Sequence, residues 1–304
     1  MLDVHRLRLL RELAQHGTIA ATARVCSLTP SAVSQQLSLL QREVGTPLLV
    51  RDGRGVLLTE AGRTLVAHTE RILAELEEAG ASIAALSESV SGVVRLAAFP
   101  TAASSLVPAA IAATRAAHPE VKVLLEEAET AEGVAALKAG RLDLLIVYEY
   151  NLLPDITDAG IELTPLVTES LLAAVPTGVR LPRGRLRLDV LRDQPWIAPR
   201  SDTALRAILE RACGLAGFAP QVDYTSDDYT VILALVAAGL GVSLVPPLAA
   251  ETVSATLRLR PVADPTLSRR VSVAARAGST RTPRIAVLIR NLRHAAAELR
   301  VPTA

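Results

Sequence analysis

Residues 18–62 read TIAATARVCSLTPSAVSQQLSLLQREVGTPLLVRDGRGVLLTEAG. Thr18 offers an N-cap for a short helix. After a turn, Thr29 caps a further helix that has Pro30 at its first position, where a missing N–H costs nothing. Apolar residues also recur at helical spacing over 4–14, which predicts a preceding helix. Two short helices separated by a turn indicate a helix-turn-helix.

The helix that follows Thr29 has an apolar face and a polar face. Its polar side carries Ser31, Ser34, Gln35, Ser38 and Arg42. Such side chains hydrogen-bond to base edges and phosphates in a major groove. The alternative is an ordinary three-helix cap, whose solvated face is more often rich in Glu and Lys. This helix contains no Glu before Glu43, and this composition favours DNA binding over an ordinary cap.

A basic hairpin follows this helix. Residues 49–58 predict two short strands around a tight turn, and Arg51 and Arg54 are placed for a wing over the phosphates. Residues 1–62 contain seven Arg and five Asp or Glu, so their net charge is 7 − 5 = +2, while the whole chain carries only +1. A neutral chain does not argue against DNA, because the basic footprint of a DNA-binding protein is local.

A long helix is predicted from Thr59 onward. Its apolar residues step alternately by four and three, at Leu65, Thr69, Ile72, Leu76, Ala79, Ile83 and Leu86. This spacing is typical of the seam of a coiled coil. A helix with one apolar seam is unstable alone, so the pattern indicates a partner helix and pairing of two chains.

Beyond residue 91 the sequence alternates between strand and helix patterns. Strands are expected at 93–99, 122–126 and 142–147, separated by helices at 104–117 and 131–139. This alternation predicts a parallel, doubly wound α/β sheet. Two α/β halves commonly bind a ligand between them.

The sequence resembles the LysR-type transcriptional regulators over essentially the whole chain. Three motifs carry the resemblance, namely TPSAVS at 29–34, GTPLLVR at 45–51 and LTEAG at 58–62. The chain departs from the family at 24–26, where the family more often has a Leu, with an effect expected on packing only. Gln36 stands where many relatives carry Lys or Arg, so we expect weaker phosphate attraction.

The resemblance implies three parts and a set of DNA contacts. The parts are a winged helix-turn-helix over 1–59, a dimerising linker helix over 60–89 and an α/β effector-binding domain over 90–304. The last is expected to be two-lobed like a periplasmic binding protein, with lobe I at 91–163 and 266–304 and lobe II at 164–265. DNA contacts are expected at Thr18, Thr29, Pro30, Ser31, Ala32, Ser34, Gln35, Gln36, Ser38, Arg42, Arg51 and Arg54. The implied partners are double-stranded DNA with an interrupted dyad site, and further copies of the chain as a dimer of dimers.

The resemblance also implies a small-molecule effector between the lobes. The expected contacts are Pro100, Thr101, Ala102, Thr130, Arg200, Ser201, Thr203 and Asp227. Thr101 follows a strand and precedes a helix, so its hydroxyl and the free N–H groups can meet a carboxylate. Plain N-capping is the alternative, and it is equally favoured for Thr130 and Ser201. The four tyrosines lie near the lobe junction, where they either line the cleft or simply pack.

Two other classes of protein fit less of the chain. A solute-binding protein of a transport system explains residues 91–304 but not 1–62, and no signal peptide is visible. An enzyme with a fused DNA-binding head needs an active site, yet no nucleophile elbow, P-loop or dinucleotide fingerprint occurs. The two lone cysteines, Cys26 and Cys213, fit neither a disulfide framework nor a four-ligand metal site. We therefore expect a cytoplasmic regulator without catalytic residues, metal, cofactor or membrane span.

Overall fold

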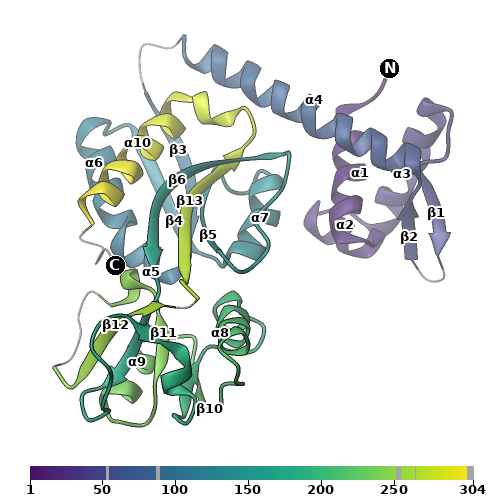
Figure 1. Ribbon diagram of the computed structural model, residues 1–304. Coiled ribbons are helices and arrows are strands. Elements are labelled where there is room, and N and C mark those ends of the chain that lie inside the picture. The colour runs from purple at the N-terminus through teal and green to yellow at the C-terminus, as the bar shows by residue number, and fades with distance from the viewer. Residues whose placement is uncertain (53–54, 87–89, 251–254, 264, 300–304) are drawn as a thin grey trace.

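The computed structural model describes residues 1–52, 55–86, 90–250, 255–263 and 265–299. Figure 1 shows a helical head that carries a hairpin, a long helix, and two α/β lobes. The elements of the head are α1 Val4–His16, α2 Ile19–Val25, α3 Pro30–Val44, β1 Leu49–Asp52 and β2 Gly55–Leu58. Each helix begins at a side-chain cap, because Asp3, Thr18 and Thr29 accept from the N–H groups of Arg6, Ala21 and Ala32.

The head is held together by one apolar core. Its buried members come from α1, α2, α3 and the entry to β1, and are Leu7, Leu9, Leu10, Leu13, Ala23, Val33, Leu37, Leu40 and Leu48. β1 and β2 pair antiparallel from Leu49 opposite Leu58 to Asp52 opposite Gly55. The tip of this wing, including Arg54, lies outside the described residues. The described part agrees with the predicted winged helix-turn-helix.

Helix α4, Glu60–Ala84, joins the head to the lobes. Thr59 accepts from Gly62 N as its N-cap. At Gly62 an added Cβ would lie 2.3 Å from Leu48 O, so only glycine lets α4 approach the head this closely. Thr69 and Leu73 are buried against the rest of the chain, whereas Leu76 is 48% exposed. Most of the predicted coiled-coil seam therefore has no partner among the residues that the structure describes.

Lobe I is built on a five-stranded mixed sheet in the order β4-β3-β5-β13-β6. Its strands are β3 Gly92–Ala98, β4 Val121–Glu127, β5 Leu144–Tyr150, β6 Ile161–Ser170 and β13 Ser268–Arg276. The helices of this lobe are α5 Pro100–Ser105, α6 Val107–Ala117, α7 Thr130–Lys138 and α10 Pro283–Glu298, with the single turn η3 Ser279–Arg281 before α10. The expected parallel sheet is correct for β3, β4 and β5, but β13 runs antiparallel to both β5 and β6. The difference arises because β13 returns from lobe II, in the opposite direction.

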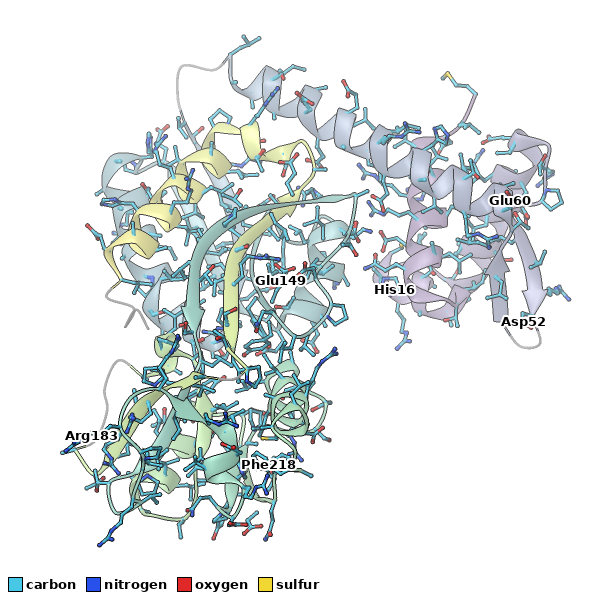
Figure 2. The ribbon with its side chains drawn as sticks, viewed as in Figure 1. His16, Asp52, Glu60, Glu149, Arg183 and Phe218 are labelled. Carbon is cyan, nitrogen blue, oxygen red and sulfur yellow. The ribbon has the colours of Figure 1, made fainter. Side chains whose placement is uncertain are left out.

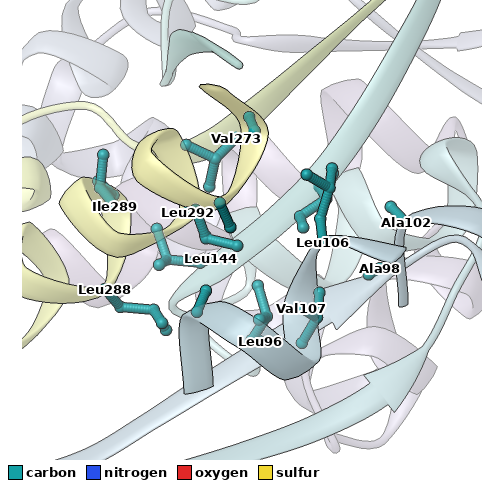
Figure 3. Close-up of a cluster of buried hydrophobic side chains, with 14 of the residues drawn as sticks. Leu96, Ala98, Ala102, Leu106, Val107, Leu144, Val273, Leu288, Ile289 and Leu292 are labelled. Carbon is teal, nitrogen blue, oxygen red and sulfur yellow. The ribbon is translucent and has the colours of Figure 1, made fainter. Parts of the chain in front are cut away.

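The core of lobe I lies between the sheet and two of its helices, α6 and α10. Figure 3 shows Leu96 and Leu144 from the sheet packed against Val107, Leu288 and Leu292. All five side chains are completely buried. The opposite face of the sheet is covered by α7, which packs on β5. This packing fixes the strand ends, at which the candidate ligand residues lie.

Lobe II contains a four-stranded sheet in the order β11-β7-β12-β8 and a parallel pair, β9 and β10. Its strands are β7 Leu172–Pro176, β8 Leu186–Arg187, β9 Trp196–Ala198, β10 Val222–Thr225, β11 Ser243–Val245 and β12 Leu257–Ala263. Its helices are α8 Ala204–Leu215 and α9 Tyr229–Ala237, with single turns η1 Leu188–Leu191 and η2 Pro247–Ala249. A second apolar core around Trp196 holds this lobe together.

The two lobes are joined by two crossing segments, β6 into β7 and β12 into β13. β6 pairs with β13 along its whole length, from Ile161 to Ser170. The change of lobe that we expected after residue 163 therefore follows Ser170 instead. The described residues include no helix that is both long and apolar enough to cross a membrane.

Candidate nucleic-acid interface and ligand site

The predicted recognition surface is the outer face of α3. Ser31, Ser34 and Gln35 are exposed; Ser31 lies about one turn before Ser34, and Gln35 follows Ser34 directly. All three face away from the core, to which α3 contributes Val33 and Leu37. Within the described part of the chain, the side chains of Ser34 and Gln35 have no hydrogen-bond partner. Their donors and acceptors are therefore available to a ligand such as the edge of a base pair.

Two other predicted contacts on α3 are already engaged within the head. Gln36 Oε1 accepts from Arg6 Nε at 2.9 Å, and Arg6 also forms an ion pair with Glu43. Ser38 Oγ donates to the main-chain oxygen of Ser34 at 2.8 Å. These bonds leave Gln36 its amide group and Ser38 its acceptor lone pairs.

The remaining predicted DNA contacts flank this face. Arg42, near the end of α3, and Arg51, in β1, are exposed cations. Thr18 Oγ1 accepts from Ala21 N at 3.2 Å, and Thr29 Oγ1 accepts from Ala32 N at the same distance, so both hydroxyls cap helices. Pro30 and Ala32 lie in the first turn of α3. Figure 2 shows Asp52 at the tip of the wing strand, on the far side of the head from the lobes.

The predicted lobe I contacts surround the start of α5. The helix begins at Pro100, earlier than the expected 104, so Thr101 and Ala102 lie inside its first turn and are buried. Thr101 Oγ1 lies 3.4 Å from Arg269 Nη2 and caps no helix. Thr130 also makes no capping bond, and its Oγ1 accepts from Tyr148 N at 3.4 Å.

A buried ion pair lies next to Thr101, at the lobe junction. Arg269, at the start of β13, is 2% exposed, and Glu169, at the end of β6, is 1% exposed. Arg269 Nε donates to Glu169 Oε1 at 2.5 Å, and Glu169 Oε2 accepts from Leu248 N in lobe II at 2.9 Å. The pair therefore joins both crossing strands to lobe II.

Aromatic rings enclose this ion pair. The Arg269 guanidinium lies 5.1 Å from the ring centre of Phe99 and 5.6 Å from that of Tyr148, within cation–π range. Tyr148 packs edge-on against Tyr150. Burial raises the pKa of Tyr150 to about 12, and burial together with Glu129 raises the pKa of Tyr148. Both hydroxyls therefore keep their protons at neutral pH and remain hydrogen-bond donors.

The predicted lobe II contacts bind chiefly to one another. Arg200 is exposed, and its main-chain N–H and side-chain Nε both bind the Asp227 carboxylate, at 3.0 and 2.9 Å. Thr203 caps α8 by accepting from Arg206 N at 3.3 Å and donates to Arg200 O. For Thr203 the structure shows the capping role. Ser201 is exposed beside it.

The comparisons identify the family. Residues 4–63 match the bacterial regulatory helix-turn-helix protein of the lysR family, and residues 87–297 match the LysR substrate binding domain. A probable hydrogen peroxide-inducible genes activator of Streptomyces viridosporus is 32% identical over 306 residues, covering 97% of this chain and 95% of its own. The chain belongs to the LysR family of transcriptional regulators.

Other LysR-type proteins and structures resemble this regulator over most of its length. The nitrogen assimilation regulatory protein Nac of Klebsiella aerogenes is 29% identical over 253 residues, covering 83% of this chain and 80% of its own. A full-length OxyR variant from Pseudomonas aeruginosa matches with a TM-score of 0.62 at 23% identity, covering 96% and 95% of the two chains. CbnR in complex with its target DNA matches with a TM-score of 0.53 at 23% identity, covering 97% and 100%. These two structures support the fold of the LysR-type regulator.

Sequence reasoning missed the ion pair at the lobe junction. Arg269 and Glu169 are 100 residues apart in the chain and belong to neighbouring strands, so no local motif joins them. The composition of the strands does not single out the pair either, because β6 also carries Glu162 and β13 also carries Arg270. The tyrosines gave a partial hint, because Tyr148 and Tyr150 contact each other and Tyr229 lies near them, whereas Tyr224 is exposed and outside the cluster.

Proposed function

We propose that this LysR-type regulator binds a specific DNA site through α3 and the wing, and that a small molecule bound between the lobes controls it. The observation that carries the first part is the exposed polar face of α3 formed by Ser31, Ser34 and Gln35. Ser34 and Gln35 have no side-chain partner among the described residues, whereas Ser31 Oγ lies 3.0 Å from Thr29 Oγ1. Hydroxyl and amide groups free of internal partners read base edges, while cations read phosphates. Arg42 and Arg51 flank that face and supply the phosphate contacts.

Pairing of two chains through α4 supports recognition of an interrupted dyad. Ile83 is 71% exposed and Leu76 is 48% exposed in the single chain, so an apolar stripe of α4 is available to pack against a partner helix. A dimer presents two recognition helices to successive major grooves on one face of DNA. Two such dimers would form the tetramer that the family resemblance implies.

The effector is proposed to contact Thr101 and Thr130 from lobe I and Ser201 from lobe II. Thr101 and Thr130 cap no helix, and each hydroxyl accepts one long bond of 3.4 Å, from Arg269 and from Tyr148 N, so each can still donate to a ligand. Ser201, in lobe II, is exposed. A ligand that contacts both lobes changes their relative position only through its differential affinity for the two arrangements. Control of transcription, rather than catalysis, and action in the cytoplasm follow from this proposal.

Two measurements test the proposal. A gel shift against the DNA upstream of the protein's own gene tests recognition, and a thermal-shift screen of small metabolites finds the effector. Thr101→Val should then lower the affinity for that effector about ten- to a hundredfold. A buried polar group of the effector that loses its hydrogen-bond partner costs roughly 1–3 kcal/mol. Ser104→Ala, on the same helix, is the control. Equal effector affinity in wild type and Thr101→Val would remove Thr101 from the site, and absence of any specific DNA complex would contradict the recognition proposal.

A further inference from the structure

The DNA-binding head is bound to lobe I of its own chain. Arg11 in α1 donates from Nη2 to the main-chain oxygen of Lys138 at 2.9 Å, and Lys138 is the last residue of α7. Lys138 Nζ lies 3.0 Å from Glu70 Oε1 in α4 and 2.9 Å from Asp158 Oδ2 in the loop before β6. One lysine therefore joins the head, the linker helix and lobe I.

The contact around Lys138 is charged and incompletely packed. Arg11, Glu70 and Lys138 are each less than 9% exposed. Their buried charges are compensated by ion pairs and hydrogen bonds within the contact and not by water. A cavity of about 260 Å³ remains between the head and lobe I, lined among others by Arg8 and Arg141. Polar interfaces with such gaps open more readily than apolar ones. This contact is suited to opening and closing.

The other end of α7 reaches the cluster at the lobe junction. Glu129 precedes the helix, and its Oε2 accepts from the Tyr148 hydroxyl at 2.8 Å. Tyr148 N donates to Thr130 Oγ1, and the Tyr148 ring lies against the Arg269 guanidinium. Tyr148 therefore ties the start of α7 to the residues proposed to meet the effector.

Between these two ends α7 is seated directly on β5. Gly133 faces the sheet, and an added Cβ would lie 2.4 Å from Leu145 Cδ1. The nine residues of the helix span about 13 Å. We expect a helix this short to shift as one rigid unit, so that a displacement of Thr130 also displaces Lys138.

We propose that α7 is the mechanical link between the lobe junction and the DNA-binding head, with Lys138 as the latch. This proposal rests on the proposed effector site for its signal. Ser31, Ser34 and Gln35 do not take part in the contact, so docking leaves the recognition face free and sets the direction in which it points. An effector whose binding displaces Tyr148 or Thr130 moves α7 and changes the contacts of Lys138.

The chain offers a direct test, because Lys122 and Lys138 are its only lysines. Lys122 is exposed in β4 and serves as an internal reference. Brief acetylation with acetic anhydride, followed by peptide mass spectrometry, gives the rate of each lysine in the full-length protein. A buried, ion-paired amine reacts only when its contact opens, so Lys138 should react at least about tenfold more slowly than Lys122. Equal rates would overturn the latch.

Two variants separate the latch from its link to the junction. Arg11→Met removes the bond from the head and should raise the rate of Lys138 several-fold. Arg24→Met, which removes an exposed cation from α2 of the head and does not line the cavity, is the control and should change nothing. If Arg11→Met unfolds the head because Glu12 loses its partner, Arg11→Met/Glu12→Leu replaces it. An unchanged Lys138 rate in a folded variant contradicts the latch.

Tyr148→Phe tests the link through α7. It removes the hydrogen bond to Glu129 but keeps the ring, and it should raise the rate of Lys138 at the far end of the helix. Tyr224→Phe, at an exposed tyrosine outside the cluster, is the control. No change in Tyr148→Phe, together with a rise in Arg11→Met, would overturn the link and leave the latch. These readouts use neither DNA nor effector, so their failure is distinct from failure of the proposed function.

Discussion

Gln35 and Gln36 are neighbours on α3 with different surroundings. Gln35 is exposed without an internal partner in the described residues, whereas Gln36 Oε1 is held by Arg6 at 2.9 Å. An amide that is free in the unbound protein can form two bonds to adenine, while an amide already bound within the protein must first exchange a partner. Two identical side chains thus differ in what they can read.

Gln35→Ala should therefore cost about 1–3 kcal/mol of binding at one or two base positions, the value of a bidentate base contact. Gln36→Ala is the matched comparison and should affect fewer sequence positions, because its carbonyl oxygen is already used. Operator variants with single base changes, titrated at fixed salt, measure both effects. Undiminished operator affinity in Gln35→Ala would show that α3 is placed differently on DNA.

The thiol of Cys213 is a second residue whose surroundings decide its chemistry. Cys213 is completely buried in α8, and burial raises its pKa to about 12. Because the thiolate is the reactive form, this thiol is protonated and inert at neutral pH. A relative named for hydrogen peroxide induction therefore gives no reason to expect that Cys213 senses peroxide.

We expect Cys213 to resist alkylation by iodoacetamide in the native protein at pH 8, and to react once the protein is denatured. Quenched reactions analysed by mass spectrometry measure this, with a Cys213→Ala protein as the blank. Peroxide should likewise leave Cys213 unmodified. Rapid native labelling would mean that lobe II opens around α8, contrary to the buried position of the residue.

At the scale of elements, the predicted seam of α4 is used differently in its first and second halves. Thr69 and Leu73 pack within the chain, whereas Leu76, Ile83 and Leu86 of the predicted seam are exposed. The second half of the seam is therefore available to a second chain while the helix stays attached to its own head and lobe I. We therefore expect this helix to serve both as a linker and as a dimerisation surface.

Leu76→Arg should abolish the linker-mediated dimer, because burial of an unpaired cation in an apolar seam costs several kcal/mol. Multi-angle light scattering across a range of concentrations measures the assembly. Ala67→Arg places the same side chain on an exposed position of α4 outside the seam and should leave the dimer intact. If both variants assemble like wild type, another surface holds the chains together.

At the scale of the whole molecule, the two lobes meet at a buried ion pair. Glu169 and Arg269 lie at the ends of the two strands that cross between the lobes, and Glu169 also accepts from Leu248 N in lobe II. Such a pair adds little net stability, yet removal of one partner leaves an uncompensated buried charge. The pair therefore fixes the geometry of the junction more than it stabilises the fold.

Arg269→Met should lower the free energy of unfolding by about 3–5 kcal/mol, the cost of leaving a buried partner charged. Arg269→Met/Glu169→Gln should recover much of that loss, since glutamine is neutral and still accepts from Leu248 N. Urea unfolding measures both variants. Arg187→Met, which breaks an exposed pair with Asp189, should leave the free energy of unfolding nearly unchanged. A small loss in Arg269→Met would show that Glu169 takes up a proton or reaches water.

The sequence by itself determined the local features of this protein. Threonine caps, the proline at the first turn of α3 and the apolar spacing of α4 act within a few residues, so they can be recognised along the chain. Only the tertiary structure decided which strands run antiparallel, that α5 begins at Pro100, and that Arg269 meets Glu169. It also placed Lys138 against the head. These outcomes depend on strand pairing and packing between residues far apart in the chain, which no local pattern encodes.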